Sequence, residues 1–196
     1  KELGHINAIS RLANDKYVWL DRFTIRNLEL INSPNVGGVP LIQVLDQSIT
    51  PMGSRLMKKW ITLPLISKAA IDSRLSKVSY FLYESEIADN VEIQLRQIGD
   101  LERIISKVAM GRISPREVVQ LRRALDHVIP IKDILVNSGL PDLQKLGDSI
   151  HDCNSVREQI SKQICEEAPN SIGKGSVIKP GFNAELDELV HLVNNS

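Results

Sequence analysis

The stretch SPREVVQLRRALDHV, residues 114–128, is the strongest local indication of the fold. Ser114 offers a hydroxyl for a helix N-cap, Pro115 suits the first helical position, and Glu117 completes a capping box. Apolar side chains then return on one face of the expected helix, at Val118, Leu121, Leu125 and Val128. The stretch therefore predicts an amphipathic helix that begins at Pro115, and Pro130 is expected to break or kink it.

Similar helix signals precede this stretch. Thr50-Pro51 combines a hydroxyl cap with proline at the first helical position, and Pro64 is expected to end that helix. A helix over residues 68–85 is indicated by an apolar face made of Ile71, Leu75, Val78 and Leu82. Asp100 caps a further helix, whose buried stripe is expected to be Leu101, Ile104, Ile105, Val108 and Ala109.

These signals divide the chain into four parts. Residues 1–22 contain a short aromatic and β-branched run and predict a small β-hairpin. Residues 23–168 form the helical core, residues 169–182 are a loop rich in Pro and Gly, and residues 183–196 begin a last helix. The predicted fold is mainly α, with several helices and a small N-terminal hairpin.

Composition narrows the function classes. The 196 residues contain 24 Lys and Arg against 24 Asp and Glu, which is not the basic balance of a dedicated nucleic-acid module. No apolar run has the length of a membrane span, and residues 1–13 do not form a signal peptide. The start at Lys1 suggests a piece of a longer protein.

Catalytic and metal-binding motifs are absent from the sequence. Gly173-Lys174-Gly175-Ser176 lacks the upstream glycine of a phosphate-binding loop, so it is interpreted as a flexible loop. The spacing of Cys153 and Cys165 matches no zinc site, and both thiols are expected to be buried. We therefore expect no catalytic residue, no cofactor and no metal in this chain.

Basic residues are unevenly distributed. Residues 51–77 hold six Lys and Arg against Asp72 alone, whereas residues 84–92 hold acidic residues without a base. The simpler interpretation is a set of solvated helix faces. The alternative is a positive patch that meets phosphate or an acidic partner, and its candidate residues are Arg55, Lys58, Lys59, Arg74 and Lys77. Trp19 and Trp60 are expected to pack in the interior rather than to stack on bases.

An ordered series of motifs covers nearly the whole chain, from about Gly4 to Leu192. The series consists of Leu20-Asp21, Thr24, Arg26-Asn27-Leu28-Glu29-Leu30, Leu45-Asp46, Thr50-Pro51-Met52-Gly53-Ser54-Arg55-Leu56, Trp60, Pro64-Leu65, Arg74-Leu75, Asp100-Leu101-Glu102-Arg103, Ser114-Pro115-Arg116, Gly181-Phe182-Asn183 and Glu185-Leu186-Asp187. In this order and spacing it resembles the core domain of MutS-type DNA mismatch-repair proteins of the bacterial type. Phe23 and Glu117 depart mildly from the family pattern.

The resemblance implies a division of labour. It identifies residues 1–196 as the first part of the core, or lever, domain, ending near the insertion of the DNA clamp, with residues 183–196 as the start of the lever helix. It implies that mismatch reading and ATP hydrolysis with Mg belong to other domains of the full-length protein. The implied setting is a cytoplasmic, nucleoid-associated homodimer without membrane contact, which binds mismatched double-stranded DNA and a MutL-type partner.

Three functions remain to be weighed. The first is a structural domain that couples the ATPase to the clamp, in which Thr50, Pro51, Asp100, Ser114 and Pro115 set the helix starts. The second is a non-specific module for the DNA backbone, and the third, ranked last, is an enzyme with an unrecognised site. We also expect the last helix to expose an apolar face and to associate with a second copy through Leu186, Leu189 or Val193.

Overall fold

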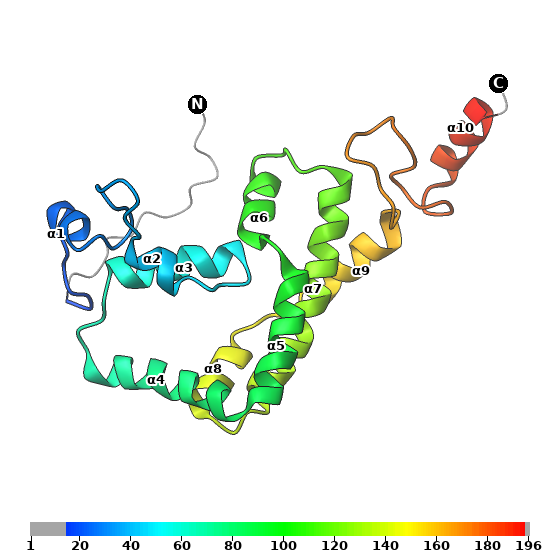
Figure 1. Ribbon diagram of the computed structural model, residues 1–196. Coiled ribbons are helices and arrows are strands. Elements are labelled where there is room, and N and C mark those ends of the chain that lie inside the picture. Colours follow the sequence, from blue (N-terminus) through cyan, green and yellow to red (C-terminus); the bar gives the residue numbers. More distant parts are fainter. Residues whose placement is uncertain (1–14, 195–196) are drawn as a thin grey trace.

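The computed structural model describes residues 15–194, which form helices joined by loops (Figure 1). The helices are α1 (Arg22–Asn27), α2 (Leu41–Leu45), α3 (Pro51–Thr62), α4 (Lys68–Tyr83), α5 (Ser85–Ile98), α6 (Leu101–Ala109), α7 (Pro115–Val136), α8 (Pro141–Asp148), α9 (Asn154–Gln163) and α10 (Ala184–Asn194). Within the described residues, β pairing is limited to two isolated antiparallel bridges, Tyr17–Leu65 and Ile164–Ile178. The prediction of a mainly α fold is confirmed.

The hairpin predicted for residues 1–22 is not supported. Residues 1–14 lie outside the described part of the chain. Beyond them, Tyr17 pairs with Leu65, and backbone hydrogen bonds of 2.8 and 3.2 Å flank this bridge. Among the described residues, the extended run therefore finds a partner in the segment that follows α3. The reason is tertiary: a short β-branched run pairs with whatever extended backbone the fold brings beside it.

The predicted helix starts are confirmed by their caps. Ser114 Oγ accepts from the Glu117 amide at 3.3 Å, and the Glu117 carboxylate accepts from the Ser114 amide at 3.0 Å, which completes the capping box of α7. Thr50 Oγ1 accepts from the Gly53 amide at 3.0 Å at the start of α3. These contacts satisfy amide groups that the first helical turn leaves without a partner.

Pro130 does not end α7. The helix runs from Pro115 to Val136 with Pro130 inside it, although proline lacks the amide that would bond one turn back. Ile131 and Leu135, which follow the proline, are buried in the main hydrophobic cluster. This burial offsets the missing hydrogen bond and continues the helix.

The core lies where α7 packs between α5 and α8, and Figure 1 shows α5 and α7 side by side. Its buried side chains are Ile98, Ala124, Ile131, Leu135 and Leu143. Gly147 of α8 permits the closest approach, because an added Cβ would lie 2.8 Å from Val136 Cγ2 and 2.9 Å from the Val136 amide nitrogen. α7 therefore serves as the central support, with α6 and α9 also packed against it.

Several side chains that were expected inside are exposed. The α4 face of Ile71, Leu75, Val78 and Leu82 is exposed, as are Ile105, Val108 and Ala109 of α6. Trp19 is 70% exposed, and Cys153 is exposed while Cys165 is half-buried. Burial was expected for the stripe of α6, for Trp19 and for the two cysteines, and it is wrong for the exposed members of that set. For α4 only an apolar face was predicted, and this helix contacts the cluster through Tyr80 and Phe81.

Backbone hydrogen bonds between two extended segments connect the end of α9 with the stretch that leads to α10. After α9, the Cys165 amide donates to the Val177 carbonyl at 2.9 Å, and the Lys179 amide donates to the Gln163 carbonyl at 2.8 Å. Asn183 Oδ1 then accepts from the Leu186 amide at 3.0 Å, at the first turn of α10. Figure 1 shows α10 at the far end of the molecule, beyond α9.

Candidate functional site

The candidate basic residues are carried by α3 and α4, and the start of α3 is firmly fixed. Asp46 accepts from the Ser48 amide at 3.0 Å and from the Ser54 hydroxyl. Hydrogen bonding from Ser54, and then from Ser48, lowers the pKa of Asp46. Gly53 lies so close to Ser48 that a Cβ would meet its side chain at 3.1 Å, so glycine permits this tight joint.

The guanidinium of Arg55 contacts two carboxylates at the start of α6. Its Nη1 and Nη2 donate to the two carboxylate oxygens of Asp100 at 3.1 and 2.7 Å, and its Nε donates to Glu102 at 2.7 Å. Asp100 also accepts from the Arg103 amide at 3.2 Å as the cap of α6. The hydrogen bond from Arg55 is the main cause that lowers the pKa of Asp100. One guanidinium thus fastens α3 to the first turn of α6.

Arg74 stacks on an aromatic ring instead of standing free. Its guanidinium carbon lies 3.9 Å from the centroid of Trp60, which is a cation–π contact between α4 and α3. Trp60 is 40% exposed, so the expectation of full core packing was wrong for this side chain. Its role is to join two helices at the surface.

Lys77 connects α4 with α8. Its ammonium donates to the Ser73 hydroxyl at 2.9 Å and lies 3.6 Å from the carboxylate of Asp142. The Ser73 hydroxyl also donates to Asp142, and this hydrogen bond is the main cause that lowers the pKa of Asp142. The side chain of Lys77 is 29% exposed.

Lys58 and Lys59 differ from the other three candidates. Both are exposed on α3, and neither forms an ion pair with any residue in the range 15–194. The structure therefore does not gather the five candidates into one free basic patch. It uses Arg55, Arg74 and Lys77 as joints between helices and leaves the two lysines to solvent.

A second set of ionic contacts fastens α9 to α7, and the sequence gave no sign of it. Asp126 accepts from Arg122 at 2.8 Å and from Arg157 at 2.7 Å, so it bridges the two helices. Arg122 also donates to Glu166 at 2.7 Å. Only Arg122 and Asp126 have local helical spacing, so no nearby motif could have revealed the partners on α9 and beyond it.

Lys107 and Glu117 form the joint between α6 and α7. The Lys107 ammonium donates to Glu117, whose carboxylate also accepts from the Ser114 amide. The hydrogen bond from Lys107, followed by that from Ser114, lowers the pKa of Glu117 to about 2. The capping carboxylate was recognised in the sequence, but its partner lay outside the capping motif.

A groove of about 620 Å³ lies between residues 172–180 and α10, and Asp187 is the one titratable side chain in its lining. Asp187 already accepts from the Gly181 amide at 2.8 Å. Among residues 15–194, no group of His, Cys, Asp or Glu has the arrangement of a metal site. No helix in that part of the chain is long and apolar enough to cross a membrane.

Comparison with known proteins gives one family. The family model described as MutS domain III matches residues 23–195. DNA mismatch repair protein MutS of Christiangramia forsetii is 49% identical over 187 residues, which cover 95% of this chain and 22% of the relative. The proteins of the same name from Flavobacterium psychrophilum and Bacteroides thetaiotaomicron are 48% and 49% identical over 188 residues, which cover 96% of this chain and 22% of each relative. The chain thus spans about a fifth of the length of these relatives.

Proposed function

The chain belongs to the MutS domain III family, and on that premise we propose that it is a structural coupling domain of a bacterial DNA mismatch-repair protein. Its task is to pass movement between an ATPase elsewhere in the parent protein and the region that holds DNA. Residues 23–168 act as the relatively rigid part of this lever. The residues that carry the function are joints between helices, and none of them takes part in bond making or breaking.

The observation that carries this proposal is the set of side-chain joints between helices that are distant in sequence. Arg55 fastens α3 to α6, Lys77 fastens α4 to α8, and Asp126 fastens α7 to α9. Each joint is partly exposed, so each contributes little to stability alone. Their proposed role is mechanical, because a shift of one helix reaches the next only if the packed helices move together.

The proposal places the other activities in the parent protein. ATP with Mg acts at a separate domain, mismatched double-stranded DNA is held by further domains, and the parent works as a homodimer that engages a MutL-type partner. Its setting is the bacterial cytoplasm, in association with the nucleoid. These assignments follow from the family and from the small share of the relatives' length that this chain covers.

The experiment uses the full-length parent protein and measures the rate at which ATP releases it from a labelled mismatched duplex. Arg55→Ala removes a joint, whereas Arg116→Ala removes an exposed charge of α7 that has no ion pair in residues 15–194. We expect Arg55→Ala to slow or uncouple release while duplex affinity stays unchanged, and Arg116→Ala to behave as wild type. Equal release rates in all three proteins would refute the coupling role of this joint.

A second candidate function rests on Lys58 and Lys59, which are exposed and adjacent on α3. Such lysines suit contact with DNA phosphate, and contact of this kind weakens steeply as salt rises. The test is a titration of the chain into matched and mismatched duplexes at low and physiological salt, followed by anisotropy. Equal, salt-sensitive binding that is lost in Lys58→Ala/Lys59→Ala would support a backbone-binding role, and no binding at low salt would exclude it.

A further inference from the structure

Ionic contacts attach α9 to α7 at both of its ends. In the first turn of α9, Arg157 Nε donates to Asp126 of α7 at 2.7 Å. Just beyond its last turn, the Glu166 carboxylate accepts from Arg122 Nη2 at 2.7 Å, and the Glu166 carbonyl accepts from Arg123 Nη2 at 3.2 Å. The two attachments therefore lie one turn apart on α7, at opposite ends of α9.

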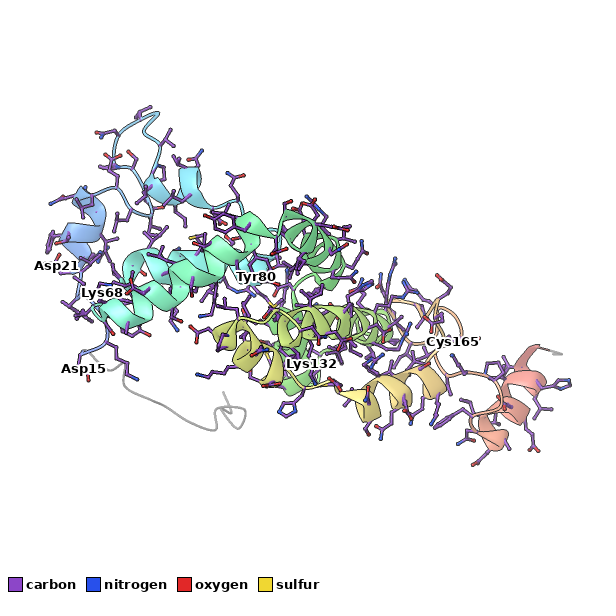
Figure 2. The ribbon with its side chains drawn as sticks, turned by 90° about the horizontal axis from the view of Figure 1, so that it is seen from below. Asp15, Asp21, Lys68, Tyr80, Lys132 and Cys165 are labelled. Atoms are coloured by element: carbon purple, nitrogen blue, oxygen red, sulfur yellow. The ribbon has the colours of Figure 1, made fainter. Side chains whose placement is uncertain are left out.

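The attachment at Glu166 also reaches the segment that leads to α10. The amide of the preceding residue, Cys165, donates to the Val177 carbonyl at 2.9 Å. Further along the chain, the Gly181 amide donates to Asp187 of α10 at 2.8 Å. Figure 2 labels Cys165 at the junction between the helical core and α10. A path of polar contacts thus runs from α7 through Glu166 to α10.

Apolar packing contributes little at this end of α9. No residue of α9 itself is buried, and among residues 164–168 the buried side chain is that of Ala168, at 4% exposure. The free energy gained by burial grows with the apolar area that is covered, and alanine offers one methyl group. The ionic contacts of Glu166 are therefore a main part of what holds the end of α9 on α7.

Opening the contacts of Glu166 leaves no buried charge without a partner. The Arg122 side chain is 18% exposed, but it also donates to Asp126 at 2.8 Å and keeps this partner when Glu166 leaves. The side chains of Arg123 and Glu166 are 52% and 45% exposed, so water solvates both once they separate. The large penalty for an unpaired buried charge does not arise here. The attachment at Glu166 thus opens at low cost while that at Asp126 stays closed.

We propose that Glu166, with Arg122 and Arg123, is a releasable latch that holds the end of α9, and with it α10, in place on α7. When the latch opens, α9 pivots about its first turn, where Arg157 stays bound to Asp126, and α10 moves with the end of α9. The use of this movement in the parent protein rests on the proposed coupling role. The latch itself is tested without ATP or DNA, so the two proposals fail separately.

Double electron–electron resonance in the 196-residue chain measures the distance between α7 and α10. Nitroxide labels on a non-natural amino acid replace Arg116 and Glu188, which are exposed, so that Cys153 and Cys165 stay unchanged. We expect one main distance in the wild type. In Glu166→Gln the displaced population should rise by a factor of up to about five, the effect of losing a partly exposed ionic contact. An unchanged distance distribution would overturn the proposal.

Glu167→Gln is the matched control. The neighbouring carboxylate is exposed and forms no ion pair within residues 15–194, so its loss should leave the distance distribution as in the wild type. Circular dichroism of each variant reports its helix content. Equal changes in Glu166→Gln and Glu167→Gln, or a loss of helix content in Glu166→Gln, would assign Glu166 to general stability and would make the latch wrong.

Arg123→Ala and salt test the latch from its other side. Arg123→Ala removes the contact with the Glu166 carbonyl and should broaden the distance distribution in the same direction, although less, because Arg122 remains. Dissolved ions screen partly exposed charges, so sodium chloride should broaden the wild-type distribution and change that of Glu166→Gln little. A wild-type distribution that does not respond to salt would contradict an ionic latch.

Discussion

Arg55 and Asp100, which are 45 residues apart in the sequence, are joined by two parallel hydrogen bonds of 3.1 and 2.7 Å. The same carboxylate caps α6 through the Arg103 amide. The side chain of Arg55 therefore links α3 to the residue that starts α6. The helices of this chain are thus connected by side-chain joints as well as by loops.

Replacing Arg55 should show that the shape of the guanidinium group contributes more to stability than its positive charge alone. Arg55→Ala should lower the urea midpoint of unfolding, and Arg55→Lys should recover only part of the loss, because an ammonium cannot make the paired contact with Asp100 together with the contact to Glu102. Lys59→Ala is the matched control and should leave the midpoint unchanged. Full recovery by Arg55→Lys would contradict this account of the joint.

Glu117 predicts an acid-dependent loss of stability. Its pKa falls from an ordinary value of 4.5 to about 2 in the folded chain, so the carboxylate stabilises the fold at pH values above 4.5. This contribution is lost as the pH falls from 4.5 through about 2. Urea unfolding of wild type and Glu117→Gln should therefore differ most near neutral pH and converge toward pH 2. A difference that does not depend on pH would show that the charge of Glu117 is not involved.

Gly147→Ala should destabilise the contact between α7 and α8. Alanine favours a helix over glycine by about 1 kcal/mol. The new Cβ, however, would lie within 2.9 Å of the backbone nitrogen of Val136, and crowding of this kind costs about 1–3 kcal/mol. We expect a net loss of about 1 kcal/mol in the free energy of unfolding, measured by chemical denaturation. A gain in stability would mean that the two helices separate at little cost.

Arg74 should protect the ring of Trp60. In a Trp19→Phe background, which leaves Trp60 as the single tryptophan, Arg74→Ala should shift the emission to longer wavelength and increase quenching by the neutral quencher acrylamide. The loss of a cation–π contact at a partly exposed site should cost about 0.5–1 kcal/mol. Arg74→Lys is the control and should keep part of the protection. Unchanged quenching in Arg74→Ala would argue against the stacked arrangement in solution.

Local sequence signals predicted where the helices begin better than they predicted which side chains are covered. The caps at Thr50, Asp100 and Ser114 lie where the sequence placed them, because capping depends on residues within one turn. Of the two outcomes expected at Pro130, the break is wrong, since α7 continues through the proline and the residues after it are buried. Periodicity identified the stripe of α4 but could not say whether anything covers it.

For the candidate site, too, the sequence shows local features but not contacts between distant residues. The basic character of residues 51–77 is visible in the sequence, but the partners of Arg55 and Lys77 lie on α6 and α8. A sequence pattern shows the charge of a basic residue but not the carboxylate that pairs with it. Distant ion pairs of this kind become visible only when the fold places the two elements side by side.

The most direct test of the coupling role is a double-mutant cycle on Arg55 and Asp100 in the full-length parent protein. The variants are Arg55→Ala, Asp100→Asn and the double, because asparagine keeps the helix cap while removing the charge. The quantity measured is the rate of ATP-triggered release from a mismatched duplex. We predict that each single variant slows release and that the double variant is no slower than either. Additive effects, or no effect at all, would contradict the claim that this joint carries the movement.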